Sequence, residues 1–315
     1  MVRLWAANTD LDWFDYLAAQ PDIYEVNFWQ PSGHAKFAAI GEGELFLFKL
    51  KSPRNVIGGF GVLSQSTNMP LSLAWEAFGD KNGAPSLAEM RARVLQYRAD
   101  AIGSADPIIG CRIVVQPVFL PERLWIPQPV SWARSIVVGK TYDTVTAEGL
   151  HLWEQVMGAA ELAMSTQQRG VAEKQSVYIA PGPRFGEPHL IRPRLGQGAF
   201  RLAVTDAYSR ECAITGGRVL PALDAAHIQA YGSGGEHSVS NGLLLRRDIH
   251  SVFDAGYLTF DEDLRVVVSD RVRTEFNNGN EYRRLQGQKL RLPPNPSYHP
   301  DPARLEWHRE NRFAA

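Results

Sequence analysis

Short apolar runs alternate with amphipathic stretches through the first half of the chain. Alternating or continuous apolar residues predict strands, and apolar residues three or four apart predict helices. The expected strands are Val26–Gln30, Glu44–Lys51, 56–64 and Ile108–Pro117, and the expected helices are Asp10–Gln20 and Leu87–Ala101. Ser86 should cap the second helix, because its hydroxyl can accept a hydrogen bond from the first turn. Strands around a small barrel, with helices between them, fit this half.

The second half begins with a helical pattern at Thr146–Gln168, which Thr146 should cap. Proline and glycine crowd residues 170–198 and indicate a linker or an extended arm. A further helix, Gly198–Tyr208, should open the second domain. After it come a strand-like run at Val219–Ile228, a helix at Gly242–Phe253 that begins at an Asn241 cap, and a C-terminal helix with His308 on its surface.

These patterns predict an α+β chain with two domains, consistent with its 315 residues. We place the first domain at 1–140, a helical and proline-rich linker at 141–190, and the second domain at 191–315. No apolar run is long enough for a membrane span, so we expect a soluble cytoplasmic protein without a membrane partner. Two cysteines cannot build a disulfide framework or a four-cysteine zinc site.

The charge distribution differs between the two halves, although the net charge is only −1. Residues 1–168 carry 13 basic against 17 acidic side chains, and residues 169–315 carry 20 against 17. Arginine dominates the basic residues of the second half and suits bidentate phosphate contacts. A genome rich in arginine codons would give the same composition, so both explanations stay open.

The candidate chemistry lies between Cys212 and Gly256. His227 ends an apolar strand-like run, Asn241 follows 14 positions later, and His250 lies nine positions beyond it. Hydrolysis of a phosphodiester needs a base for the attacking water and a cation for the departing oxygen. One histidine can act as the base and the other as a metal ligand, while the asparagine holds the loop.

This stretch resembles the HNH (ββα-metal) endonucleases, in particular bacterial restriction-type members. The shared pattern is C-x-x-TG, then LDAAHI, then NGLLL-x-x-DIH-x-VFD, and the preceding Arg192–Tyr208 also looks like the flank of such proteins. The resemblance implies a ββα-metal fold in which His227 is the general base, Asn241 the structural asparagine and His250 a metal ligand. It also implies one divalent ion, Mg²⁺ or alternatively Mn²⁺ or Ni²⁺.

Two positions depart from the HNH pattern. Many such sites have Asp or His immediately before the base, where this chain has Ala226. Asp224 is two residues from Ala226 and on the same strand face, so it is our candidate for the second metal ligand; an ordinary strand-end acid is the alternative. Thr215 stands where a CxxC motif would have its second cysteine, so we expect no structural zinc and a buried Cys212.

Other polar residues near the motif have open roles. His237 in the loop could touch phosphate or be merely solvated. Asp254, four residues after His250, could support that histidine or simply end its helix. Arg246 and Arg247 are candidates for contacts to the DNA backbone, with a solvated charged face as the alternative.

Residues 24–140 are similar to the PUA superfamily, which includes EVE and YTH-like modules. The similarity rests on an aromatic first strand, a Gly-Glu turn into an apolar strand and a glycine-rich strand within VNFWQPSG…GEGELFLFKLK…VIGGFG. Several members bind a flipped modified base in an aromatic pocket. The resemblance implies a modified-base pocket here, and its candidate residues are Trp29, Asn27, Gln30 and Ser32; a core role for the tryptophans is the alternative.

The resemblance to modification-dependent restriction endonucleases implies a DNA endonuclease that restricts double-stranded DNA carrying modified cytosine. A double-strand cut needs two cleavages, so a homodimer is possible. Two alternatives stay open from the sequence: a non-catalytic nucleic-acid reader, and an HNH nuclease acting on unmodified DNA or RNA. The intact set of His227, Asn241 and His250 argues against the first, because binding alone would not need all three.

Overall fold

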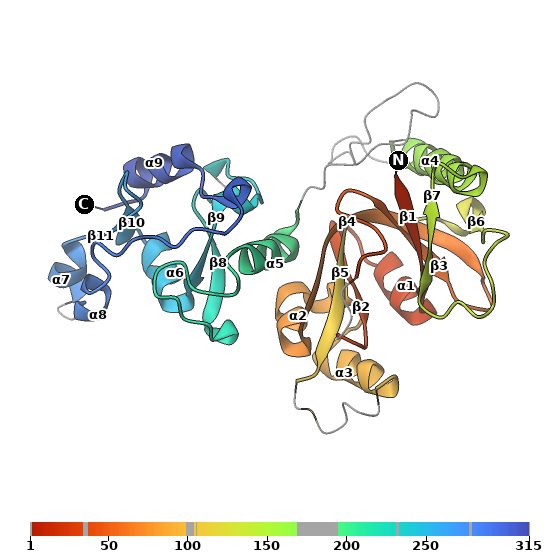
Figure 1. The fold of residues 1–315 in the computed structure, drawn as a ribbon, viewed down its shortest axis with the longest axis horizontal. Helices are drawn as coiled ribbons and strands as arrows, with labels where there is room; N and C mark the ends of the chain where they lie inside the picture. Colours follow the sequence, from red (N-terminus) through yellow and green to blue (C-terminus); the bar gives the residue numbers. More distant parts are fainter. Residues whose placement is uncertain are drawn as a thin grey trace. The chain divides into compact units, whose positions relative to one another are not determined.

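The computed structural model describes residues 2–33, 37–98, 104, 106–168, 195–230, 233–276 and 279–314. Its contacts divide the chain into two compact units, 1–194 and 195–315, and each is described by itself. Both contain helices and strands, which confirms the α+β class (Figure 1). The proline-rich part of the expected linker lies outside the described residues. No helix of the described chain is long and apolar enough to cross a membrane.

The first unit is built on one mixed sheet of seven strands in the order β2-β5-β4-β3-β1-β7, with β6 paired to β4. β1 and β3 run parallel, and the other neighbours run antiparallel. No ladder joins the edge strands β2 and β7 in the described part of the chain. The strands are β1 (Arg3–Thr9), β2 (Glu25–Gln30), β3 (Leu45–Leu50), β4 (Val56–Pro70), β5 (Ile108–Phe119), β6 (Ile126–Pro127) and β7 (Gly139–Asp143).

Helices pack against this sheet and bury its central strand along its whole length. All six residues of β3 are buried, which explains its nearly continuous apolar sequence. Ser86 caps its helix as expected, with its hydroxyl accepting a hydrogen bond from the Glu89 N–H at 3.2 Å. The helices are α1 (Leu11–Ala18), α2 (Leu71–Phe78), α3 (Leu87–Gln96) and α4 (Ala147–Gln168).

The first unit extends beyond the boundary expected at residue 140. β7 crosses that position and pairs with β1, from Ala7↔Gly139 to Arg3↔Asp143. α4 then buries Leu152, Trp153 and Val156 within the same unit. β7 has little apolar periodicity of its own, because it is an edge strand whose place is set by its pairing with β1.

The second unit contains the two-stranded sheets β8–β9 and β10–β11. Its core gathers buried side chains from α5, β8, β9 and α6, including Phe200, Leu223, Leu244 and Phe253. The elements are α5 (Gln197–Ala207), β8 (Leu223–His227), β9 (Gly242–Arg246), α6 (Arg247–Asp254), β10 (Leu258–Phe260), β11 (Val266–Val268), α7 (Arg271–Phe276), α8 (Asn280–Arg283) and α9 (Pro302–Asn311).

The helix expected at Gly242–Phe253 is wrong in its first half. Gly242–Arg246 forms the strand β9, paired antiparallel with β8, and the helix α6 begins only at Arg247. Three successive leucines fit a buried strand as well as a helix, so their apolar pattern cannot choose between the two. The pairing with β8 makes the choice, and it moves Asn241 from a helix cap to the start of a strand.

Candidate active site

The strands β8 and β9 and the helix α6 form a ββα unit, and each predicted catalytic residue lies at one of its junctions. His227 ends β8, Asn241 directly precedes β9, and His250 lies in the second turn of α6. Gly242 allows β9 to approach α5 closely, since a Cβ there would lie 2.3 Å from Cγ2 of Val204. The chain after Asn241 therefore requires glycine for packing.

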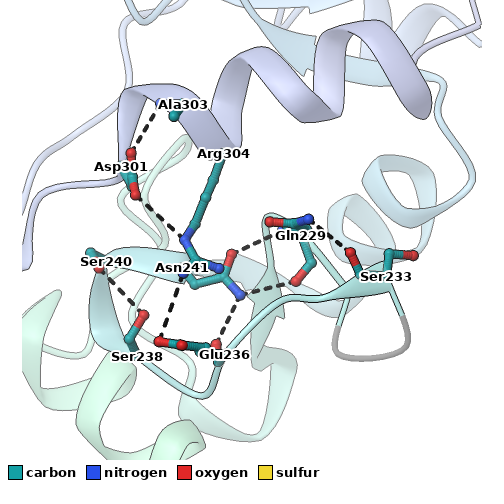
Figure 2. A network of polar contacts seen from close by, with 9 residues as sticks. All are labelled: Gln229, Ser233, Glu236, Ser238, Ser240, Asn241, Asp301, Ala303 and Arg304. Carbon is teal, nitrogen blue, oxygen red and sulfur yellow. Dashed lines mark hydrogen bonds and ion pairs between the residues drawn. The ribbon is translucent and has the colours of Figure 1, made fainter.

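Asn241 is fully buried and ties together the two ends of the loop that joins β8 to β9 (Figure 2). Its Oδ1 accepts a hydrogen bond from the Gln229 N–H at 2.9 Å. Its Nδ2 donates to the carbonyl oxygens of Gln229 and Glu236, both at 2.9 Å. A buried amide that makes three hydrogen bonds holds its neighbours rigidly. Asn241 thus joins the segments of this loop, and its catalytic importance stays a prediction.

His227 is half-buried against an apolar wall. Its ring stacks on Phe200 of α5, with centroids 3.9 Å apart and planes at 14°. Its Nε2 lies 2.9 Å from Nδ1 of His237 in the same loop. Burial, reinforced by the neighbouring His237, lowers the pKa of His227 to about 4. The imidazole is therefore neutral near neutral pH and can accept a proton.

His250 lies between two carboxylates. Its Nδ1 is 3.3 Å from Oδ2 of Asp224, and its Nε2 is 3.1 Å from Oδ2 of Asp254. Burial alone would lower the pKa of His250, but the hydrogen bonds to both carboxylates outweigh it and raise the pKa to about 9. The ring is therefore an imidazolium at neutral pH when no metal ion is bound.

The donor chemistry around His250 fits a divalent ion that keeps several waters. An imidazole nitrogen and carboxylate oxygens suit Mg²⁺, Mn²⁺ or Ni²⁺. Among the described residues, no three His, Cys, Asp or Glu side chains form a ready-made metal site. The ring of His250 has Asp224 on one nitrogen and Asp254 on the other, so an ion would be held by His250 and a single carboxylate.

Arg201 of α5 is a site residue that sequence reasoning missed. Its Nε lies 3.3 Å from Oδ1 of Asp224, and its side chain is only 15% exposed. Burial alone would raise the pKa of Asp224, but His250 and Arg201 hold it below its usual value. Arg201 follows Phe200 within the flank that resembled HNH proteins. That flank was the available signal, but it could not show that α5 lies against β8.

The two arginines proposed for the DNA backbone lie where β9 ends and α6 begins, and they differ in their surroundings. Arg246 forms a bidentate ion pair with Asp248, with Nε 3.0 Å from Oδ1. Arg247 is exposed. The role of both residues in binding DNA stays a prediction.

The structure places His308 differently from the sequence-based expectation, whereas it places Cys212 as expected. His308 was expected on the surface but is only 2% exposed. Its ring stacks on Phe253 at 3.9 Å, and its Nδ1 lies 3.0 Å from Oγ1 of Thr259. The weak amphipathic pattern of this charged helix hid the side that packs on α6. Cys212 is buried, as expected.

The four residues proposed for the modified-base pocket differ in burial and in their hydrogen-bond partners. Trp29 donates its indole N–H to the Asn82 carbonyl at 2.9 Å, and Asn27 donates to Oδ1 of Asn82 at 2.8 Å. Asn27 is fully buried. Gln30 accepts from Nη2 of the buried Arg112 at 3.0 Å. Ser32 is exposed. Residues 27 and 29 share one face of β2 and residue 30 takes the other.

Part of the second unit matches a known protein family. Residues 212–261 match the HNH_2 family, described as HNH endonuclease. A solved structure titled "Modification dependent TagI restriction endonuclease" is similar over 97% of this chain and 81% of that chain, with 15% identity and a TM-score of 0.29. No curated protein matches the sequence.

The family match contains His227, Asn241 and His250, so the prediction of an HNH endonuclease domain is confirmed. This domain supports nuclease activity, and HNH nucleases generally use a divalent metal ion. The PUA-like identity of the first unit stays a prediction.

Proposed function

We propose that this protein is a metal-dependent DNA endonuclease that restricts DNA carrying modified cytosine. One observation carries the nuclease part: a neutral His227 and the His250–Asp224 pair lie in one ββα unit, near enough for the charges of His250 and Asp224 to influence the pKa of His227. A proton acceptor and a cation-binding pair at the same place are what phosphodiester hydrolysis requires. A pure binding module would need neither.

In the proposed reaction, His227 takes the proton from the attacking water and Asn241 keeps the surrounding loop in place. Cleavage then leaves a 5′ phosphate and a 3′ hydroxyl. Asp224 and the Nδ1 of His250 would hold a divalent ion, Mg²⁺ or alternatively Mn²⁺ or Ni²⁺, which stabilises negative charge on the departing oxygen. Asp254 would accept the remaining N–H of His250 and so fix its ring orientation. Arg246 and Arg247 would contact the DNA backbone.

The reader part of the proposal rests on the first unit. Trp29 and Ser32 lie at the end of β2 and beyond it, where Ser32 is exposed and Trp29 is half-buried. We assign them the contact with a flipped base, for which stacking on an aromatic ring is worth about 1–3 kcal/mol. Asn27 and Gln30 would support that rim through Asn82 and Arg112. Such an enzyme would act in the cytoplasm, and a homodimer would let it cut both strands.

The test is digestion of phage DNA containing plain, 5-methyl, 5-hydroxymethyl or glucosylated cytosine, with Mg²⁺, Mn²⁺ or Ni²⁺ and with EDTA. We expect cleavage that needs a divalent ion and favours one of the modified substrates. Equal cleavage of all four DNAs would remove the reader role and leave the nuclease. Full activity in EDTA after exhaustive metal removal would contradict the metal-dependent mechanism.

Trp29→Phe and Trp29→Ala separate reading from cutting. The phenylalanine keeps an aromatic face, whereas alanine removes it. We therefore expect Trp29→Ala to lose discrimination between modified and plain DNA, with Trp29→Phe close to wild type. Competition titrations at one salt concentration measure this, because phosphate contacts make the affinity depend on salt. Unchanged discrimination in a folded Trp29→Ala variant would exclude Trp29 from the pocket.

A further inference from the structure

The loop between β8 and β9 contains a second histidine whose ring reaches the proposed base. The Nδ1 of His237 lies 2.9 Å from the Nε2 of His227, and the ring centroids are 5.0 Å apart. His237 also lies beside Phe200, at 5.6 Å between centroids, so both imidazoles share one apolar wall.

The backbone around His237 is fixed more firmly than that of a solvated loop. The Oδ1 of Asn241 accepts a hydrogen bond from the N–H of Gln229, two residues after His227. Its Nδ2 donates a hydrogen bond to the carbonyl of Glu236, one residue before His237. The Ser238 N–H donates to the Glu236 carbonyl, and the Asn241 N–H donates to the Ser238 carbonyl, both at 2.9 Å. On the outer side, Nη2 of Arg304 lies 3.9 Å from Oε2 of Glu236 (Figure 2).

We propose that His237 is a positioning residue that selects the tautomer of His227, so that Nε2–H is donated to Nδ1 of His237 and Nδ1 of His227 takes the proton from water. A neutral imidazole has one N–H and one lone pair, so the nitrogen used in the histidine pair must carry the hydrogen if the other nitrogen is to be the base. This inference rests on the proposed role of His227.

The same hydrogen bond should strengthen during the reaction. When His227 takes the proton it becomes an imidazolium, and its Nε2–H then makes a charge-assisted bond to the lone pair on Nδ1 of His237. A carboxylate in place of His237 would also accept this bond, but it would put a negative charge close to the DNA phosphates. An imidazole lone pair orients the base without adding a negative charge.

Two variants of the full chain test the role in catalysis. His237→Leu removes the acceptor, and His237→Asn retains an amide oxygen near the position of Nδ1. We expect His237→Leu to lower kcat roughly 10–100-fold with little change in KM, and His237→Asn to recover most of the loss. A change in KM alone would instead assign His237 to phosphate contact and overturn the proposal, as would an unchanged kcat in His237→Leu.

A second measurement does not depend on activity. The chain has 8 histidines, so ¹⁵N-histidine labelling of the wild-type protein allows the tautomer of His227 to be read by NMR, with a folded His227→Ala variant for assignment. We expect hydrogen on Nε2, and hydrogen on Nδ1 would overturn the proposal. If a folded His227→Ala variant still cuts DNA, His227 is not the base, whereas the tautomer measurement still decides whether His237 orients that ring.

Discussion

A histidine at the end of β8 and a histidine in the second turn of α6 have two different charge states. Both His227 and His250 are partly buried, and burial lowers the pKa of each. At His227 the neighbours are Phe200 and another imidazole, so the pKa falls to about 4. At His250 the carboxylates of Asp224 and Asp254 reverse the effect of burial.

His308 shows what burial does without carboxylate bonds. It stacks on Phe253 of α6, and burial lowers its pKa to about 4, as for His227. Among these three histidines, the direction of the pKa shift depends on whether carboxylates contact the ring, and not on how deeply the ring is buried. One histidine of the site can thereby accept a proton, and the other would have to give up a proton to bind the proposed cation.

The largest expected effect is the loss of the base. His227→Ala should lower kcat by about 10²–10⁴-fold, because removing a general base removes that much of the rate. DNA binding and the melting temperature should stay near wild type. Single-turnover cleavage, a binding titration and thermal unfolding measure these three quantities. A folded His227→Ala protein that cuts at the wild-type rate would show that His227 is not the general base.

The next effect concerns the two carboxylates of His250. Asp224→Asn should weaken Mn²⁺ binding by about 10–100-fold, since it removes a proposed ligand charge next to the cation. Asp254→Asn is the matched control, because Asp254 contacts the other ring nitrogen of His250, and it should weaken Mn²⁺ binding less. Titration calorimetry of the two variants gives the ranking. The reverse ranking would place the ion on the Nε2 side.

The charge of His250 predicts a dependence of metal binding on pH. Its pKa is raised to about 9, so the ring is protonated below that value and must lose a proton to bind an ion. Mn²⁺ affinity should therefore fall about tenfold for each unit from pH 8 to pH 6. His227, with a pKa of about 4, stays neutral across this window. A flat affinity between pH 6 and 8 would show that His250 binds no ion.

The smallest expected effect comes from Arg201. Its guanidinium lies beside Asp224, so Arg201→Gln should strengthen Mn²⁺ binding a few-fold in the absence of DNA, worth about 1 kcal/mol. Arg246→Gln is the control, because Arg246 pairs with Asp248 instead. Calorimetry of both variants at one ionic strength compares them. Equal changes in the two would mean that only the net charge matters.

The amino-acid sequence by itself determined the three HNH residues and their order. Their spacing, with a glycine after Asn241 and a helical pattern around His250, is local information that survives without knowledge of packing. It also indicated most strands and helices of the first unit, such as the strand within Glu44–Lys51, which its short length and the flanking Gly43 and Pro53 favour over a helix. The cap at Ser86 belongs to the same class, since a side chain and its own first turn suffice.

Only the tertiary structure decided which elements meet. The pairing of β8 with β9 made Gly242–Arg246 a strand, and the parallel pairing of β1 with β3 joins segments about forty residues apart. The packing of α5 brought Phe200 to His227 and Arg201 to Asp224. The folded loop brought His237 to His227. A pKa depends on such neighbours, so the opposite charges of His227 and His250 follow from contacts between elements that no local pattern specifies.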